Sequence, residues 1–369
     1  MMNRDKLKGF ISGLIFAVVL GIAAMGVNVL AAPVEKKISV VYDDLKIYVD
    51  GVLTQTKDAD GKTIEPFISN GVTYLPVAAL SRILGKDVSW DGKTKSIYIG
   101  KKPDIKAQEV TVSNVDELFA ALGSNKHIKL KPGVYNISDL KQGYSESNNI
   151  YWHEEYDGNE LVLNGIYNLT LEGLGEEPAE IVVEPRYADV LTFLNCTKIS
   201  LKNIKAGHTL AKGECAGGVL NFESSKDIDI SNSSFYGSGT YGIIALNTEN
   251  LKFNNSIIEE CTNGAMTISN CKEFAFTNSI FRQCEGFKLF NIQSSSNIVY
   301  DKCEISENEA LYKDTDIIDT SLSSGIKFTD CKFINNKSFS FNQDTISDID
   351  FTGTTFEGNS FDDLLNQDK

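Results

Sequence analysis

The stretch DIDISNSSF (residues 227–235) decides the fold, because variants of it recur along the chain. They are NLKFNNSII (250–258), EFAFTNSIF (273–281), NIVYDKCEI (297–305), GIKFTDCKF (325–333) and DIDFTGTTF (348–356). Successive copies start 23, 23, 24, 28 and 23 residues apart. Every second residue at the start of each copy is apolar, which is the side-chain period of a β-strand. A fixed period of this length predicts a solenoid, whose repeats bury their apolar faces against one another.

Each repeat is expected to hold several strands. Earlier copies of the pattern lie at Leu169–Leu171 and Ile199–Leu201, and a second apolar strand precedes each copy, as in Val219–Phe222. We therefore expect about three short strands per coil and about eight to ten coils, a mainly β chain folded as a parallel β-helix. A repeat already filled with strands leaves no room for the helix of a leucine-rich repeat. The strands are also too short for a transmembrane barrel.

One position in the repeat predicts a corner of the coil. It lies four residues after the first apolar residue of its copy, and Asn or Asp occupies it in most copies. Asparagine adopts the left-handed backbone conformation more readily than other residues with a Cβ. Stacked copies can also exchange amide hydrogen bonds. The residues are Asn203, Asn232, Asn255, Asn278 and Asp330.

The composition narrows the possible partners. The chain has 369 residues, enough for two or three domains, and a formal net charge of −15 with few arginines. This balance argues against a nucleic-acid partner, which needs clustered positive charge. It suits a soluble surface protein, and it would also suit cation binding. Seven cysteines are an odd number for a fully paired set and lie at solenoid positions. We interpret them mainly as small buried side chains rather than as disulfides or metal ligands.

The first 32 residues predict a targeting segment. A basic start, with Arg4, Lys6 and Lys8, precedes the uncharged apolar run Phe10–Leu30. This arrangement is typical of a secretory signal peptide. The run is also long enough to span a bilayer, so an uncleaved N-terminal membrane anchor is the alternative. In both cases we expect the rest of the chain to be exported and either secreted or held at the cell surface.

Residues 36–101 predict a small α+β domain. Strand-like runs flank Asp50-Gly51, a helical pattern runs from Val77 to Leu84 and stops at Gly85, and a hairpin is expected over residues 88–99. The motifs GVTYLPV (71–77), LGK (84–86) and WDGKT (90–94) resemble those of the copper amine oxidase N-terminal-like domain, also called the stalk domain. The family is common on secreted proteins of Gram-positive bacteria, and the resemblance implies a non-catalytic spacer without copper. The segment contains no histidine, the ligand that copper prefers.

A β-helix domain is expected over residues 109–362. Ser113 or Asn114 can cap a short helix that runs to Leu122, and the strand of His127–Leu130 leads into Pro132-Gly133-Val134-Tyr135. This opening resembles that of pectate-lyase-like right-handed parallel β-helices. The resemblance implies that the amphipathic helix closes the N-terminal end of the solenoid. The polar and aromatic segment 139–160 lacks the repeat, and we interpret it as a long functional loop.

The early coils carry the candidate site. The register places Arg186, Cys215 and Gly239 at equivalent positions, about 4.8 Å apart per coil, with His208 close to them. In polysaccharide lyases of the resembled fold, a Lys or Arg removes the proton beside a uronate carboxylate. The candidate catalytic residues are Arg186, His208 and Glu214, and the candidate substrate-binding residues are Asp189, Tyr187, Tyr236, Tyr241, Trp152 and His153. The simpler interpretation is that Arg186 pairs with Glu184 or Asp189 and that His208 stabilises a turn.

Other chemistry finds less support in the sequence. The acidic pairs Asp227/Asp229 and Asp314/Asp316 do not match a calcium-ligand spacing, so Ca²⁺ is possible but no cofactor is firmly implied. Three histidines make a multi-histidine metal site unlikely to form, and no G-x-S-x-G motif is present. We expect an exported cell-surface β-helix protein that binds glycan or another envelope partner. The alternatives are a polysaccharide lyase or hydrolase that uses the early coils, and a purely structural solenoid.

Overall fold

The computed structural model describes residues 37–43, 45–49, 52–57, 62–86, 88–91, 96–100, 106–140, 147, 149–211, 213, 216–237, 240–286, 288–310, 316–341 and 349–361. The chain divides into two compact units, residues 1–104 and 105–369, and each is described by itself. Within the described ranges, no helix is long and apolar enough to cross a membrane. The expected export segment, residues 1–32, lies outside these ranges.

The first unit consists of small hairpins and one helix. Its antiparallel pairs are β1 (Ile47–Val49) with β2 (Val52–Thr54), β3 (Phe67–Ser69) with β4 (Val72–Tyr74), and β5 (Val88–Asp91) with β6 (Ser96–Ile99). Helix α2 (Val77–Ile83) ends as expected at Gly85, whose φ is +62°. The turn Asn70-Gly71 has positive φ at both residues, the preferred geometry of a two-residue hairpin turn. Residues 38–42 form no strand, and Val41 makes an antiparallel bridge to Ile68.

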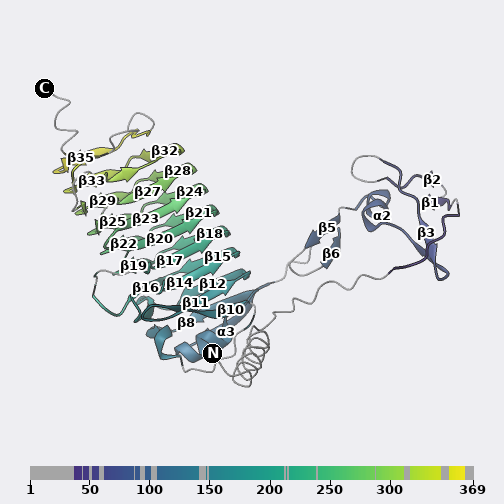
Figure 1. Cartoon of the computed structure of the whole chain (residues 1–369), viewed down its shortest axis with the longest axis horizontal. Coiled ribbons are helices and arrows are strands. Elements are labelled where there is room, and N and C mark those ends of the chain that lie inside the picture. Colours follow the sequence, from purple (N-terminus) through teal and green to yellow (C-terminus); the bar gives the residue numbers. More distant parts are fainter. Residues whose placement is uncertain are drawn as a thin grey trace, which may run out of the picture. The chain divides into compact units, whose positions relative to one another are not determined.

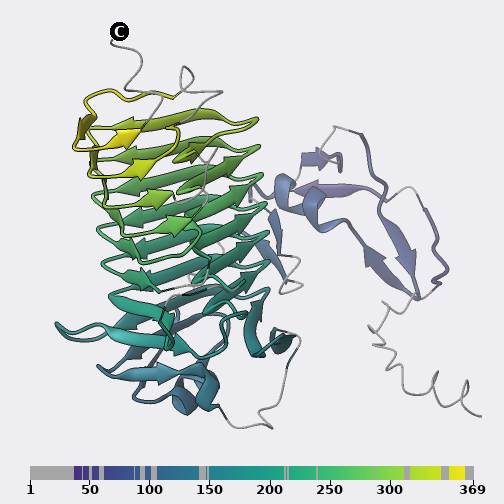
Figure 2. The same ribbon diagram turned by 60° about the vertical axis from the view of Figure 1, so that its left-hand side comes forward.

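The second unit is a stack of coils built on three long sheets, in agreement with the three strands per coil that the repeat predicts (Figures 1 and 2). Along a coil the chain passes through sheet I, sheet II and sheet III in turn. Sheet I contains β10 (Ile150–Glu155), β11 (Gly158–Asn164), β14 (Leu191–Leu194), β17 (Leu220–Glu223), β20 (Tyr241–Leu246), β23 (Gly264–Ser269), β27 (Phe290–Gln293) and β31 (Ile318–Asp319). All its pairings are parallel except that of β10 with β11.

Sheets II and III stack in the same way. Sheet II contains β7 (Gln108–Val112), β8 (Lys126–Leu130), β12 (Tyr167–Gly173), β15 (Thr197–Lys202), β18 (Lys226–Ser231), β21 (Glu249–Asn254), β24 (Lys272–Thr277), β28 (Ser296–Asp301) and β32 (Ser324–Thr329). Sheet III contains β9 (Val134–Asn136), β13 (Ala179–Val183), β16 (Ile204–His208), β19 (Ser234–Tyr236), β22 (Ile257–Glu259), β25 (Ile280–Arg282), β29 (Glu304–Ser306), β33 (Lys332–Ile334) and β35 (Thr355–Glu357).

A short fourth sheet lies on the connection from sheet III to sheet I in the later coils. It contains β26 (Glu285–Gly286), β30 (Glu309–Ala310), β34 (Lys337–Ser338) and β36 (Ser360–Phe361). The connections from sheet I to sheet II and from sheet II to sheet III are short turns. The connection from sheet III to sheet I is longer and varies, running from His208 to Leu220 in one coil and from Tyr236 to Tyr241 in the next. Variation between coils is therefore concentrated at this edge.

The core confirms the register read from the repeat. Phe253, Phe276, Tyr300 and Phe328 are successive partners in sheet II, and all four side chains are buried. The rings of Phe276 and Tyr300 stack with centroids 4.7 Å apart, and those of Tyr300 and Phe328 are 4.3 Å apart. Each such side chain contributes about 1.5–3 kcal/mol when fully buried. These columns are the main source of the fold's stability.

The predicted asparagine corner is also confirmed. All five residues that the repeat singled out have positive φ, between +49° and +52°. The amide of Asn255 donates a 2.5 Å hydrogen bond to the amide oxygen of Asn232 in the preceding coil. Asn203 instead donates to the carbonyl oxygens of Gly173 and Gly175. The corner therefore joins neighbouring coils and reverses the chain without strain.

Buried polar side chains form further ladders at the inner corners. Ser225 accepts a hydrogen bond from the main-chain nitrogen of Cys196, and Thr248 accepts one from that of Ser225. The six described cysteines are all buried, several at such positions, which agrees with their interpretation as small buried side chains. Cys215 lies outside the described residues. In the last coils, Asn308, Asn336 and Asn359 form a ladder of amides.

Helix α3 (Val115–Ala121) closes the N-terminal end, as expected from its amphipathic pattern. The Asn114 side chain accepts from the main-chain nitrogen of Glu117 at 2.9 Å, while Glu117 accepts from the main-chain nitrogen of Ser113 at 2.8 Å. This arrangement resembles a capping box, except that Glu117 accepts from the residue before the N-cap Asn114. Leu118 of the helix is buried in the core cluster, and Phe119 packs against it. The helix thus shields the interior of the first coil from water.

Candidate functional site

The segment expected as a long loop contains an antiparallel hairpin instead. Strands β10 and β11 pair from Ile150 with Leu163 to Glu155 with Gly158, and Tyr156 and Asp157 form the turn. The expectation failed because β10 is an edge strand whose residues are all partly or fully exposed, so it lacks the alternation of buried and exposed residues that marks the repeat. Trp152, a predicted binding residue, stacks on Phe119 of α3 with ring centroids 6.1 Å apart. Trp152 therefore anchors the hairpin to the capping helix.

The hairpin tip is fixed to the next coil by Asp157. Its Oδ2 accepts from the main-chain nitrogen of Arg186 at 2.7 Å, and its Oδ1 accepts from that of Tyr187 at 3.2 Å. Gly158 lies so close to Pro185 that a Cβ at this position would be 2.3 Å from the Pro185 Cγ. The turn of the hairpin and the segment 185–187 therefore form one rigid edge.

Two exposed tyrosines stand on this edge. The rings of Tyr156 and Tyr187 have centroids 5.2 Å apart at an angle of 49°. Tyr156 is 87% exposed and Tyr187 is 38% exposed. The core gains nothing from rings placed in this way, and adjacent exposed aromatic rings commonly mark a binding surface. We call this pair the tyrosine platform.

Arg186 lies beside the platform and is half-buried. Its guanidinium packs on the main chain of Gly213, where a Cβ would be 2.1 Å from Nη1. The predicted pairing with Glu184 or Asp189 is not found. Within the described part of the chain, no hydrogen bond or ion pair engages the guanidinium. Arg186 is therefore held in place by its backbone and by packing, with its N–H donors available.

His208, the last residue of β16, lies inside this edge with 4% of its surface exposed. Its Nε2 is 3.0 Å from the main-chain oxygen of Ala188, which makes this nitrogen the donor. Its buried Nδ1 has no partner among the described residues. Burial is the main cause that lowers the pKa of His208, so the ring is neutral near pH 7. A ring in this position tethers the segment around Ala188 rather than facing solvent.

Asp189 and Glu160 form a second buried ladder at the end of sheet I. Glu160 accepts from the main-chain nitrogen of Asp189 at 2.9 Å, and Asp189 accepts from that of Gly218 at 2.5 Å. The second oxygen of Asp189 accepts from the Asn221 amide at 2.7 Å. Burial raises the pKa of both carboxyl groups, and the charge of Asp189 raises that of Glu160 further. Each carboxyl group therefore links its own coil to the next one through a hydrogen bond to a main-chain nitrogen.

The raised pKa of Glu160 predicts a pH effect on stability. The folded state holds this proton more tightly than the unfolded chain does, so stability falls as the pH rises from about 4.3 toward the raised value. Glu160→Gln removes this penalty and keeps an oxygen for the Asp189 N–H. We expect equal urea midpoints for the variant and the natural chain near pH 4, and a higher midpoint for the variant at pH 7. A difference independent of pH would contradict the assignment.

The two other predicted tyrosines lie on different faces. Tyr236 ends β19 in sheet III, and its hydroxyl donates to Glu180 at 2.7 Å while the Lys205 ammonium lies 4.3 Å from its ring centroid. Burial, followed by the hydrogen bond to Glu180, raises its pKa well above the usual value. Tyr241 begins β20 in sheet I and is half-buried, and burial raises its pKa. Neither is part of the tyrosine platform.

The structure therefore brings together only part of the predicted set. Arg186, Tyr187 and His208 lie on one edge, together with Tyr156 and Asp157, which the sequence did not single out. His153 is exposed on the hairpin, 3.0 Å from Glu155. Glu214 and Cys215 lie outside the described residues. In the described ranges, no group of three His, Cys, Asp or Glu side chains is arranged to hold a metal ion.

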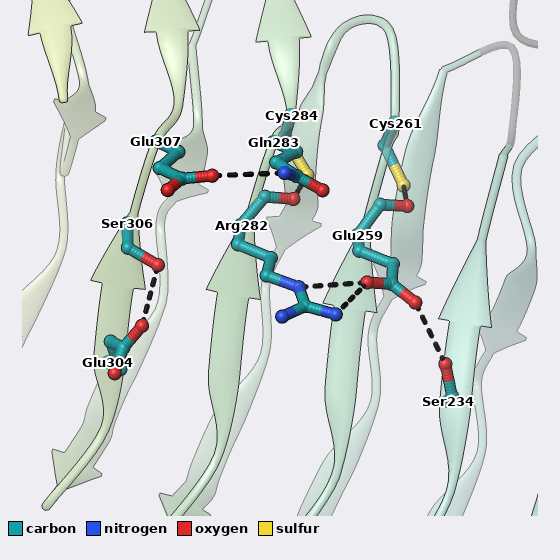
Figure 3. A network of polar contacts seen from close by, with 9 residues as sticks. All are labelled: Ser234, Glu259, Cys261, Arg282, Gln283, Cys284, Glu304, Ser306 and Glu307. Carbon is teal, nitrogen blue, oxygen red and sulfur yellow. Dashed lines mark hydrogen bonds and ion pairs between the residues drawn. The ribbon is translucent and has the colours of Figure 1, made fainter. Parts of the chain in front are cut away.

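A network in the middle of the solenoid was not predicted (Figure 3). Glu259 and Arg282 are register partners on sheet III, and one Glu259 oxygen accepts from Arg282 Nε at 2.9 Å and from Nη2 at 2.6 Å. Ser234 donates to Glu259 at 3.4 Å, and Gln283 donates to Glu307 at 3.0 Å. The step of 23 residues between Glu259 and Arg282 could have revealed the pair. Its charges are matched, so it stabilises the stack.

Comparison with known families agrees with both domains. Residues 217–366 match the family model of the right-handed β-helix region. Two overlapping stretches, residues 21–99 and 48–129, match that of the copper amine oxidase N-terminal domain. These matches confirm that a stalk-like domain precedes a right-handed β-helix. None of the curated proteins matches the chain.

Solved structures share the fold at low identity. Pectate lyase Pel9A is 14% identical, with a TM-score of 0.40 over 70% of this chain and 78% of that one. ORF18 of Geobacillus virus E2 is 8% identical, with a TM-score of 0.38 over 75% and 68%. The A-module of the mannuronan C-5 epimerase AlgE4 from Azotobacter vinelandii is 12% identical, with a TM-score of 0.27 over 68% and 88%. Similarity at this level carries no argument about the site.

Proposed function

We propose that this chain, a stalk domain joined to a right-handed β-helix, is an exported surface protein that binds glycan at the tyrosine platform. The exposed Tyr156–Tyr187 pair carries the proposal. The apolar face of a sugar ring packs on an aromatic ring, and nearby polar groups bond its hydroxyls. Asp157, which follows Tyr156, accepts from the main-chain nitrogens of Arg186 and Tyr187, so the backbone that carries both tyrosines is fixed before a ligand binds and the ordering cost of binding is lower.

Binding is favoured over cleavage by the state of His208, a predicted catalytic residue, and of Asp189, a predicted substrate-binding residue. His208 is buried and donates to Ala188, and both oxygens of Asp189 accept hydrogen bonds within the fold. A general acid or base must be within hydrogen-bond reach of the atom it serves. In this arrangement neither side chain faces a ligand bound outside the coil. Export is supported by the basic and apolar segment 1–32, as a sequence-based expectation.

Substitution of the platform tests the proposal. We expect Tyr156→Ala and Tyr187→Ala each to weaken glycan binding about tenfold, since each removes one stacking surface worth about 1.4 kcal/mol. Affinity electrophoresis of the full chain through gels with different soluble polysaccharides measures this effect. Tyr48→Ala is the matched control, because Tyr48 is 60% exposed in the stalk unit. The proposal fails if no polysaccharide retards the natural chain, or if the platform variants bind as well as it does.

The same protein preparations test the enzymatic alternative. Incubation with uronate-containing polysaccharides, with and without Ca²⁺, is followed by the absorbance of unsaturated product and by an assay for reducing ends. We expect no product under conditions in which the chain binds. Product that disappears in Arg186→Gln would instead support the lyase.

A further inference from the structure

Arg186 is positioned more firmly than a surface arginine needs to be. Asp157 accepts from its main-chain nitrogen at 2.7 Å, and Pro185 before it packs on Gly158. The guanidinium itself packs on the main chain of Gly213. Arg186 is only partly exposed in this arrangement, so part of the hydration of the cation is lost. A fold normally compensates such a loss with an acceptor.

Arg282 provides the comparison within the same chain. It is also part of the solenoid, and its Nε and Nη2 both donate to Glu259. For Arg186, no acceptor is found in the part of the chain that the structure describes. Among the described residues, the fold therefore supplies an anion to Arg282 and none to Arg186, which lies beside two exposed aromatic rings. An anionic group on a ligand bound at the platform would accept hydrogen bonds from the Arg186 guanidinium and balance its charge.

The surroundings limit how much negative charge the ligand carries. Glu154, Asp157 and Glu184 are exposed on the hairpin and on the segment leading to Arg186, and the chain as a whole has a net charge of −15. A polymer with a carboxylate on every sugar would be repelled by these three side chains, while only one of its carboxylates could pair with the guanidinium. Repulsion between like charges near a protein surface is comparable in size to the attraction of one ion pair. One isolated anionic group avoids most of this repulsion.

We propose that the platform binds a glycan that is mostly neutral and carries isolated anionic substituents, one of which pairs with Arg186. The inference rests on the proposed function and names the ligand class of the same site. The tyrosines hold the neutral sugars, and Arg186 selects the charged one. The shared chemistry is a single carboxylate, sulfate or phosphate group on a sugar.

The test uses affinity electrophoresis of the full chain with three polymers. They are glucuronoxylan, which carries isolated uronate branches, the same polymer after chemical reduction of its carboxyl groups, and polygalacturonate, which is charged on every sugar. We expect glucuronoxylan to bind about five to ten times more tightly than its reduced form, and polygalacturonate to bind less tightly than glucuronoxylan. Arg186→Gln should abolish the preference for the native over the reduced polymer. Arg282→Gln, the control, should keep the preference.

Each other outcome contradicts one part of the proposal. Equal binding of the native and reduced polymers, or a preference that survives in Arg186→Gln, overturns the role of Arg186. Tightest binding to polygalacturonate overturns the restriction to isolated charges. Absence of binding to all three polymers overturns the proposed function itself, which is a different result from binding without charge preference. A sulfated and a phosphorylated xylan in place of glucuronoxylan then separate the possible anions.

Discussion

Replacing Asp189 by alanine is expected to lower the free energy of unfolding of the early coils by about 3 kcal/mol. The carboxyl group is 7% exposed and accepts from the Gly218 N–H and from the Asn221 amide. Alanine leaves the buried Gly218 N–H and the partly buried Asn221 amide without their acceptor. Each unsatisfied buried donor costs about 1–3 kcal/mol. The loss should appear as a lower urea midpoint and as faster amide exchange in residues 189–221.

Asp189→Asn separates the structural role from a role in binding. Asparagine keeps an oxygen for the Gly218 N–H, and it lacks the charge whose burial raises the pKa of Asp189. We therefore expect most of the stability to be retained at pH 7 and glycan binding to be unchanged. Asp229→Ala, at an exposed position of β18, is the control for removal of a carboxylate. Loss of binding in a stable Asp189→Asn protein would show that Asp189 contacts the ligand, as the sequence had predicted.

The repeat made the fold predictable because its information is local and redundant. Ile228, Leu251 and Phe274 occupy the same position in successive copies, so the period alone fixed which residues stack. A shift by one residue would turn every apolar side chain outward, and only one register buries them all. The asparagine corner was predictable for the same reason. Asn232 and Asn255 needed only their left-handed preference and their spacing.

The site was less predictable than the fold, because it depends on the direction in which each side chain points and not only on the coil that carries it. The register correctly placed Arg186 and His208 on neighbouring coils. It could not show that the His208 ring points inward, since this orientation depends on a hydrogen bond to the main-chain oxygen of Ala188. Asp157 was missed because its partners are main-chain N–H groups, which leave no mark on the sequence. The hairpin was missed because an edge strand does not need buried apolar residues.

The largest loss of stability is expected from Asn336→Ala, about 4 kcal/mol at the C-terminal end of the solenoid. Asn336 has no exposed surface. Its amide nitrogen donates to the Ile305 oxygen at 2.8 Å and to the Asn359 side chain at 2.9 Å. Its amide oxygen accepts from the main-chain nitrogen of Asn308 at 3.1 Å and from the Asn308 side chain at 2.8 Å. Alanine therefore removes three buried hydrogen bonds and one partly buried hydrogen bond, and the Ile305 oxygen and the Asn308 donors lose a partner inside the coil.

The effect should be confined to the neighbouring coils, because each coil of a solenoid contacts only the next. Amide exchange should accelerate in residues 303–341 while residues 161–230, which carry Arg186 and the attachment of the hairpin, keep their protection. Glycan binding should then persist in a protein whose C-terminal coils have loosened. Asn254→Ala, at an exposed position of β21, is the matched control and should leave the urea midpoint unchanged. Loss of protection along the whole stack would show that the coils unfold as one unit and that the site depends on the distant end.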